Sequence, residues 1–426
     1  MTESESFRRT GNRISWLLVP LLGGMQLVGL RRSLDDLGGV SAALVVFVAL
    51  AVLTSPWWWR RRGELGRWGF MLVAFFLAIV GCALISIAAH PAPVVHTSED
   101  FVVQARWVVI PWLTAPAALF AGMGLVLSAE ATRRLSVMLA GCAAMVVAAV
   151  VDWPRQAAIH GSWRFATAMG GSATIHVAML LAAALGLAHA LRGPRARLGW
   201  AVAVLSMAAL VATGSRAALL MLVTWLVILA AGRIRSREQV KRLWPVWLGI
   251  VVLAALVVTV PTLARLVSFT DLKRAENLET SLQLWTSSGS SVLWGAGVGQ
   301  VWPWYVFESG AVAVPGAGMV PSAAGDLLLS PHSTFLALVV ELGVLGAILG
   351  AGCVVALVGL LVSSRSHPGR FLVSAAVVAT LVASLFDTYW FKNFEISVLW
   401  WMTAAVALTW PTAKDPAMPP PVSVER

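Results

Sequence analysis

The chain has 426 residues, of which 59% are hydrophobic and 12% are charged. In soluble globular domains about a quarter of the residues are charged, so this composition indicates a protein whose solvent is lipid. The formal net charge of +11 does not indicate nucleic-acid binding, because the basic residues form short clusters between apolar runs rather than one basic face. We therefore expect membrane lipids, and no nucleic acid, among the partners.

The first apolar run, residues 14–30, follows a cluster of arginines and ends at Arg31 and Arg32. It resembles a signal peptide, but no small-residue cleavage site follows the run. We expect it to remain attached as the first membrane span.

Further apolar runs close to the ~20 residues needed to cross a bilayer recur as far as Trp410. They predict about twelve transmembrane helices. The predicted spans begin near residues 14, 38, 67, 106, 134, 172, 197, 214, 244, 344, 371 and 394. We expect an all-α polytopic membrane protein in which residues 1–411 form a single transmembrane domain. The Pro-rich segment 412–426 is expected to be a disordered cytoplasmic tail.

Basic residues are concentrated in alternate connections and near both termini. These connections contain Arg60 to Arg62, Arg133 and Arg134, Arg192, Arg233 to Arg242, and Arg365. By the positive-inside rule they face the cytoplasm, which predicts a multi-pass protein of the bacterial inner membrane with both termini cytoplasmic. Cys82, Cys142 and Cys353 each lie in an apolar run without a CxxC motif. They predict neither a disulfide nor a zinc site.

One connection on the outward side, residues 265–331, is much longer than the others, and long loops usually carry function. Apolar residues at three- and four-residue spacing from Leu272 to Trp285 predict an amphipathic helix lying on the membrane surface or over a cavity, with Thr270 or Asp271 as its N-cap. Three alternating glycines at 295, 297 and 299 are typical of a tight turn rather than a phosphate loop, and the sequence onward to Gly325 predicts an irregular loop.

Tryptophan is abundant, with 21 copies. Most are expected at the membrane interfaces, as Trp57 to Trp59 beside Arg60 indicate. Trp285, Trp294, Trp302 and Trp304 cluster in the long loop instead, where their flat apolar rings would suit the faces of sugars.

Arg216 begins a predicted span, with small residues before it and apolar sequence on both sides. An ionisable group there is a functional candidate, because burying its charge in lipid costs at least ~2.5 kcal/mol. The alternative is an interfacial arginine that snorkels to headgroups.

His332 lies where the long loop returns to the membrane, after Pro331. An imidazole titrates near neutrality and can accept a proton from a hydroxyl; a helix-start histidine bonded to water is the alternative. Glu341 would lie on the opposite face of a straight helix, about 13 Å further along. A His–Glu dyad therefore requires a helix break, and Glu341 is expected to satisfy a neighbouring span.

Further arginines lie in the connections predicted to face outward. Arg265 and Arg274 belong to a basic group in the long loop, and two guanidinium groups would suit a diphosphate. An ion pair with Glu276 or Glu279 is the alternative for Arg274. Arg155 and Arg164 occupy another such connection, where snorkelling explains them as well as ligand binding does.

The order of these features resembles the O-antigen ligase and O-antigen polymerase superfamily. The pieces that carry the resemblance are Gly214-Ser215-Arg216-Ala217, Arg274 to Trp285, Leu293 to Gly299, and His332 to Gly346, with an earlier piece from Arg164 to Ser172. The resemblance covers roughly residues 160 to 362. Ser333 stands where the family usually has asparagine, and it can still donate and accept a hydrogen bond.

The resemblance implies a membrane glycosyltransferase. Family members move a glycan from a polyprenyl-diphosphate carrier to an acceptor hydroxyl on the outer face of the inner membrane, without an essential metal or cofactor. His332 would act as base, and Arg216 with Arg274, Arg265 and Arg164 would bind the diphosphate. Ser333, Trp285, Trp302 and Trp304 would contact acceptor or sugar.

Two other classes of function compete with this one. A transporter or flippase of lipid-linked sugars also needs many spans and outward cations, but the sequence shows no inverted repeat and few carboxylates deep in a span. A scaffold role leaves Arg216 and His332 unexplained. The choice between ligase and polymerase stays open, as do the sugar repeat and the acceptor.

Overall fold

The structure is a computed structural model that describes residues 5–30, 42–89, 95–96, 102–103, 106–192, 196–233, 272–299, 319–322, 325–328, 333–391 and 393–411. The span expected near residue 244 and the tail 412–426 lie outside this part of the chain.

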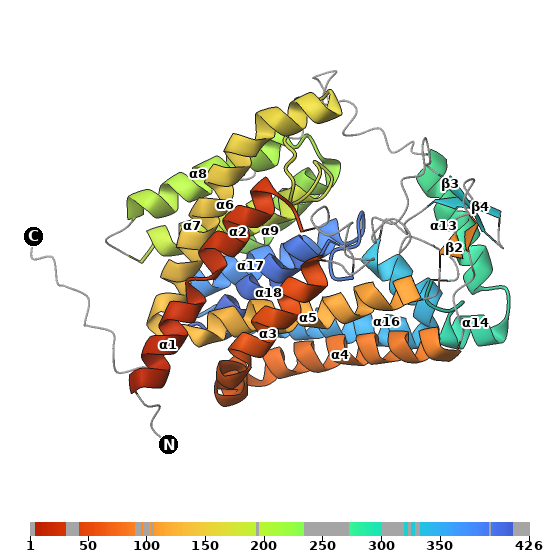
Figure 1. Cartoon of the computed structure of the whole chain (residues 1–426), viewed down its shortest axis with the longest axis horizontal. Coiled ribbons are helices and arrows are strands. Elements are labelled where there is room, and N and C mark those ends of the chain that lie inside the picture. Colours follow the sequence, from red (N-terminus) through yellow and green to blue (C-terminus); the bar gives the residue numbers. More distant parts are fainter. Residues whose placement is uncertain are drawn as a thin grey trace, which may run out of the picture.

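The described residues are mostly helical, and Figure 1 shows several of the long helices running side by side in roughly one direction. The first nine are α1 (Glu5–Ser15), α2 (Leu18–Leu27), α3 (Ala42–Arg61), α4 (Gly66–Ala89), α5 (Arg106–Ser128), α6 (Ala131–His160), α7 (Ile175–Ala190), α8 (Ala196–Ala212) and α9 (Arg216–Arg233). They are followed by α13 (Leu272–Trp285), α14 (Gly289–Trp294), α16 (Thr334–Ser363), α17 (Pro368–Ala383) and α18 (Phe394–Leu408). A short 3-10 helix, Arg62–Leu65, joins α3 to α4.

Several of these helices are long and apolar enough to cross a membrane. In the described residues these are the helical segments Ala42–Ala89, Val109–Ser128, Ala131–Ile159 and Thr334–Ser363, of which the first contains both α3 and α4. The helices α7, α8, α9, α17 and α18 are apolar but shorter. The expectation of an all-α membrane protein is therefore confirmed in outline.

The first predicted span is not one continuous helix. Residues 16 and 17 form a turn between α1 and the ten-residue α2. Pro20 lacks the N–H that a helix continuing from α1 would use there. The apolar composition of residues 14–30 does not reveal this interruption. Residues 14–30 thus divide into the end of a polar helix and a short apolar one.

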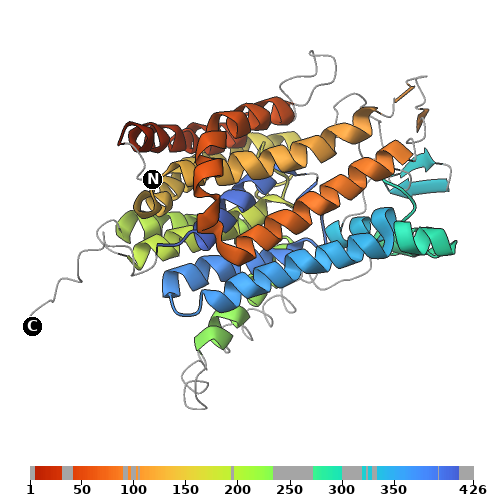
Figure 2. The ribbon, with the colours of Figure 1, turned by 90° about the horizontal axis from the view of Figure 1, so that it is seen from below.

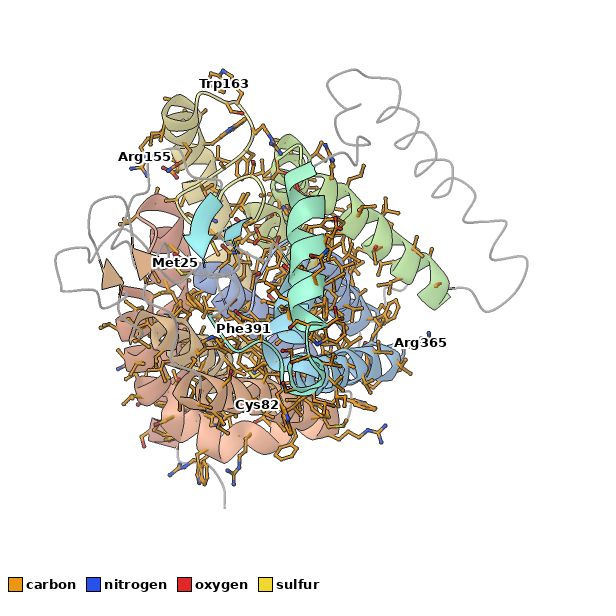
Figure 3. All side chains as sticks on the ribbon, turned by 90° about the vertical axis from the view of Figure 1, so that its right-hand side faces the viewer. Met25, Cys82, Arg155, Trp163, Arg365 and Phe391 are labelled. Carbon is orange, nitrogen blue, oxygen red and sulfur yellow. The ribbon has the colours of Figure 1, made fainter. Side chains whose placement is uncertain are left out.

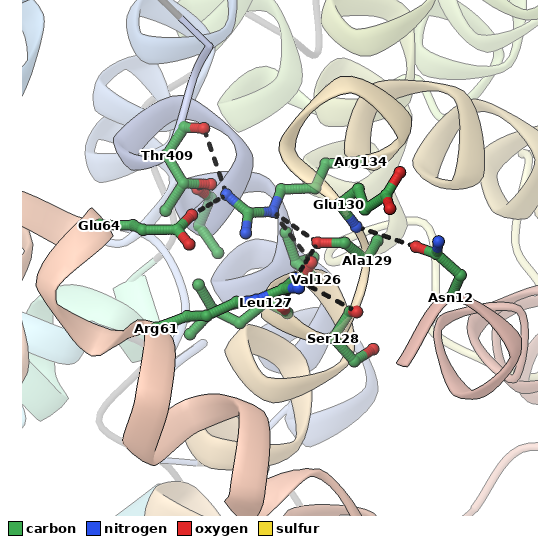
Figure 4. A network of polar contacts seen from close by, with 11 residues as sticks. Asn12, Arg61, Glu64, Val126, Leu127, Ser128, Ala129, Glu130, Arg134 and Thr409 are labelled. Carbon is green, nitrogen blue, oxygen red and sulfur yellow. Dashed lines mark hydrogen bonds and ion pairs between the residues drawn. The ribbon is translucent and has the colours of Figure 1, made fainter. Parts of the chain in front are cut away.

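A cluster of polar contacts defines one end of the helical bundle, which we call the α1 end. There Arg134 of α6 pairs with Glu64 at 2.6 Å and donates to the Thr409 carbonyl beyond α18. Asn12 of α1 accepts from the backbone N–H of Glu130. Figure 4 shows that these contacts join α1, α3, α5, α6 and α18 at one place. The start of α1 and the finish of α18 therefore lie at the same end of the bundle.

The opposite end, which we call the α13 end, is where α13 and α14 lie (Figure 1). Figure 3 views the molecule from that side, with α13 crossing in front of the bundle. Helices α4 and α16 run side by side between the two ends (Figure 2).

The core contains several tryptophans that were expected at the membrane interface. Trp401 is fully buried and packs edge-on against Phe76 at 4.8 Å, and Phe391 stacks on the same ring. Of the group beside Arg60, Trp57 is 5% exposed whereas Trp59 is 67% exposed. The number of tryptophans does not distinguish buried positions from interfacial ones, because a large ring fills space between helices as well as it covers an interface.

The loop expected to be irregular contains a strand pair. β3 (Met319–Ser322) and β4 (Gly325–Leu328) are antiparallel, with Met319 opposite Leu328. A second short pair joins β1 (Val95–His96) to β2 (Val102–Val103). Two to four residues give too short a pattern for alternation to be recognised in the sequence.

Candidate functional site

The turn between α8 and α9 presents Arg216 at the first position of α9. Gly214 has a φ of 56° in this turn, a left-handed conformation that glycine adopts without strain. The buried Thr213 hydroxyl donates to the Leu210 carbonyl at 2.7 Å and accepts from the Ser215 N–H. Arg216 is half-buried, so the turn holds a guanidinium group beside the N-terminus of an apolar helix.

Arg164 lies against the same turn. Its guanidinium donates from Nε to the Thr213 carbonyl at 2.9 Å and from Nη2 to the Gly214 carbonyl at 3.1 Å. The backbone N–H of Phe165 adds a hydrogen bond to the Ala212 carbonyl. Two arginines that the sequence nominated separately, Arg164 and Arg216, therefore belong to one local structure.

The connection between α6 and α7 is held in shape by Asp152, which is 3% exposed. Its carboxylate accepts from Arg155 at 2.7 Å, from Gln156 at 3.0 Å and from the backbone N–H of Ala168 at 2.9 Å. Arg155 also donates to the Leu27 carbonyl. The guanidinium of Arg155 therefore pairs with a carboxylate, whereas the side-chain partners of Arg164 among the described residues are the carbonyls of Thr213 and Gly214.

The start of α16 is fixed by Ser333 and Thr334. Ser333 is the N-cap, since its hydroxyl accepts from the Leu336 N–H at 3.2 Å. The Thr334 hydroxyl donates to the Asp387 carbonyl and accepts from the Tyr389 N–H. Residues 333 and 334 are thereby docked on the connection between α17 and α18.

Tyr389 joins that connection to the one between α6 and α7. Its hydroxyl lies 3.3 Å from the Ala173 carbonyl and 3.3 Å from Nε2 of His176 in α7. Sequence reasoning missed Tyr389 and His176. The rarity of tyrosine, with two in the chain, was the available signal. Through Tyr389, hydrogen bonds lead from Thr334 to the connection between α6 and α7, which also carries Arg164.

Glu341 does not satisfy a neighbouring span as expected. Its carboxylate accepts from the Gly299 N–H at 3.0 Å, in the segment that follows α14. The helix α16 also departs from straightness, with a φ of 65° at Gly343. Because the segment after α14 lies far away in sequence, its arrival beside Glu341 was not foreseeable from helical geometry.

The predicted amphipathic helix is present as α13, with the expected bounds Leu272–Trp285. The Trp285 indole donates to the Val292 carbonyl at 3.2 Å and so ties α13 to α14. Leu278 and Leu282 are 45% and 38% exposed and border a depression of about 580 Å³. The depression is open, and its lining comes from one face of α13 and the residue after it, Trp285 included. The contact of Trp285 with a ligand stays a prediction.

The remaining predicted site residues cannot be placed. His332, Arg265, Trp302 and Trp304 lie outside the described residues. For Arg274 only the helical backbone of α13 is described. These assignments stay predictions.

Comparison with known proteins leaves the family open. No protein-family model matches the chain. No curated protein matches it either.

Proposed function

We propose that this protein is a membrane glycosyltransferase that moves a glycan from a polyprenyl-diphosphate carrier to an acceptor hydroxyl. The most direct support is the pair of hydrogen bonds from the Arg164 guanidinium to the turn that precedes α9, whose first residue is Arg216. We propose that the guanidinium groups of Arg164 and Arg216, with the N-terminus of α9, form a cationic site at one end of the apolar bundle.

This arrangement suits a diphosphate leaving group. Arginine binds phosphate oxygens in a fixed two-pronged geometry, and a helix N-terminus adds N–H groups that favour an anion. As the bond between the anomeric carbon and the diphosphate breaks, negative charge grows on the leaving oxygen. Cations already in position stabilise that charge without having to reorganise.

The acceptor hydroxyl must lose its proton as it attacks. We propose that His332 takes it, with the acceptor oxygen displacing the diphosphate at the anomeric carbon and inverting its configuration. His332 immediately precedes Ser333, which the structure docks on the α17–α18 connection. That connection reaches the Arg164 loop through Tyr389, which supports a base near the same end of the bundle.

The membrane arrangement is part of the proposal. We propose about twelve spans, with the α1 end and both termini in the cytoplasm and the α13 end facing outward, in a bacterial inner membrane. The arginines at the α1 end support this orientation by the positive-inside rule. The donor would then be used on the outer side, in the assembly of a surface polysaccharide.

The decisive experiment incubates the purified protein in detergent with a lipid-linked glycan and candidate acceptors. We expect a covalent product, glycan joined to acceptor, with release of polyprenyl diphosphate. A transporter or flippase makes no covalent product in the absence of a membrane, so lack of product with every acceptor tested would contradict the proposal.

A gene knockout would then distinguish the two kinds of transferase. Polymer that accumulates on its lipid carrier indicates a ligase, whereas single repeat units indicate a polymerase. Unchanged surface glycans would contradict both.

A further inference from the structure

The segment that follows α14 enters a break in α16. We call residues 295–299 the glycine segment, and residues 272–294, which comprise α13 and α14, the arm. We propose that Glu341 and the break at Gly343 form a receptor for the glycine segment, and that this receptor holds the arm in position for donor binding. Glu341 is then a positioning residue; its link to donor binding rests on the proposed function.

The break exposes backbone groups that a straight helix would use itself. In an α-helix each carbonyl accepts the N–H four residues later. Here the Val340 carbonyl accepts from the Ala296 N–H at 2.8 Å, and the Glu341 carbonyl accepts from the Gly297 N–H at 3.3 Å. The glycine segment therefore supplies donors to the helix at its break.

The Glu341 side chain completes this set. It is 1% exposed in an apolar helix, where an ionisable group is costly unless it has a partner. Its Oε1 accepts from the Gly299 N–H at 3.0 Å, while the Val298 N–H donates to the Ser86 hydroxyl of α4 at 3.1 Å. Four consecutive backbone N–H groups, residues 296–299, are thus bound by two neighbouring helices.

The close approach requires glycine on both sides. A Cβ at Gly295 would overlap the carbonyl group of Glu341, and one at Gly343 would overlap the backbone at Leu293 and Gly295. Both residues also have positive φ, 82° and 65°, which disfavours any side chain. The two segments therefore fit each other as backbone against backbone.

The receptor restrains the arm because the glycine segment follows the arm directly in the chain. Helix α14 packs against α16, and the Trp285 indole ties α13 to α14. Helix α13 crosses the end of the bundle in Figure 3. Losing the Glu341 carboxylate would release the glycine segment and let the arm move, which would weaken binding of the donor more than it slows the bound reaction.

Hydrogen–deuterium exchange of the purified full-length protein tests the receptor itself. In Glu341→Leu, which removes the side-chain acceptor of the Gly299 N–H, we expect the Gly299 amide to exchange at least about tenfold faster. In Glu341→Gln, whose amide oxygen still accepts a hydrogen bond, we expect exchange like the wild type. Ser86→Ala is the second variant and should release the Val298 amide without altering α16.

Two results would overturn the receptor: equal protection in Glu341→Leu and the wild type, or loss of protection in Glu341→Gln equal to that in Glu341→Leu. Unchanged exchange in α7 serves as the check that each variant is folded. Should Glu341→Leu fail this check, the Ser86→Ala and Glu341→Gln results decide alone.

The transfer assay tests the link to donor binding. Glu341→Leu should raise KM for the lipid-linked donor about tenfold with kcat within about twofold of the wild type, and Glu341→Gln should restore the wild-type KM. Loss of kcat in Glu341→Gln would instead indicate a carboxylate that acts in the reaction. A wild type that transfers no glycan would contradict the proposed function while leaving the exchange result valid.

Discussion

Arg134, near the start of α6, and Arg164, just after the end of α6, have different surroundings. At the α1 end, Arg134 is 2% exposed, pairs with Glu64, and with Arg61 donates to backbone carbonyls where α5 finishes. At the α13 end, Arg164 is exposed, and its side-chain partners in the described part of the chain are the carbonyls of Thr213 and Gly214. Buried, paired positive charge stabilises the fold, whereas we propose that Arg164, whose side chain contacts only carbonyls among the described residues, binds an anion.

The largest expected effect is on the reaction at the α13 end. Arg216→Ala should reduce glycan transfer by at least about 10³-fold without changing protein yield, because in the proposed reaction it removes a cation from the place where charge develops. Rates of product formation by purified protein check this. Transfer by Arg216→Ala at the wild-type rate would remove Arg216 from the mechanism.

His332→Ala should abolish transfer to a similar extent, since the acceptor would lose its base. A rate that recovers at high pH, where more acceptor is deprotonated, would support this role. Full activity at neutral pH would exclude it.

The next effect is on stability at the α1 end. Arg134→Ala should lower the free energy of unfolding by about 2–3 kcal/mol, because a buried charged group loses its ion pair and its hydrogen bonds. Arg133→Ala is the matched control: its side chain is 62% exposed and 3.6 Å from Glu130, so the change should be under about 0.5 kcal/mol. Thermal unfolding in detergent distinguishes them, and equal midpoints would break the comparison between the two ends.

Arg164→Ala should affect activity rather than stability. It should leave the free energy of unfolding nearly unchanged and reduce the rate of transfer about 10- to 100-fold, as expected for the loss of one charged hydrogen-bonding group. Arg164→Lys keeps the charge and should recover part of the rate. Arg365→Ala, an exposed arginine in the connection between α16 and α17, is the control and should transfer at the wild-type rate. A drop in stability with no change in the rate of transfer would show that Arg164 has only a structural role.

The smallest effect is at the start of α16. Ser333→Ala removes the N-cap hydrogen bond to Leu336 and should cost about 1 kcal/mol of stability. Ser363→Ala, at the other end of the same helix, removes a hydrogen bond to the carbonyl three residues earlier and should cost less. Equal unfolding midpoints for the two variants would contradict a capping role for Ser333.

Local patterns in the sequence predicted much of the fold. Long apolar runs located the helices, and three- and four-residue spacing predicted α13 with its bounds at Leu272 and Trp285. The span expected to begin near residue 344 is part of α16, which begins earlier, at Thr334, and contains a break at Gly343. No sequence pattern marks that break. A glycine in an apolar helix is usually helical, and the break depends on a backbone contact with Gly295.

The sequence predicted which residues belong to the candidate site, but not how they are arranged in space. Arg216 stood out because charge is costly near lipid, whereas Arg164 was nominated only by the family resemblance. Their association depends on carbonyls 49 and 50 positions along the chain from Arg164, and no sequence pattern marks a carbonyl. Tyr389 was missed for the same reason, because it acts by joining two connections.

The central claim is that the arginines of the α13 end recognise a diphosphate. The most direct test is the affinity of purified protein for polyprenyl diphosphate and for polyprenol, in the wild type and in the double variant Arg164→Ala, Arg216→Ala. We expect the wild type to prefer the diphosphate by at least about 100-fold, as two charged hydrogen-bonding groups would give, and the double variant to lose that preference. Equal preference in both proteins would contradict the account.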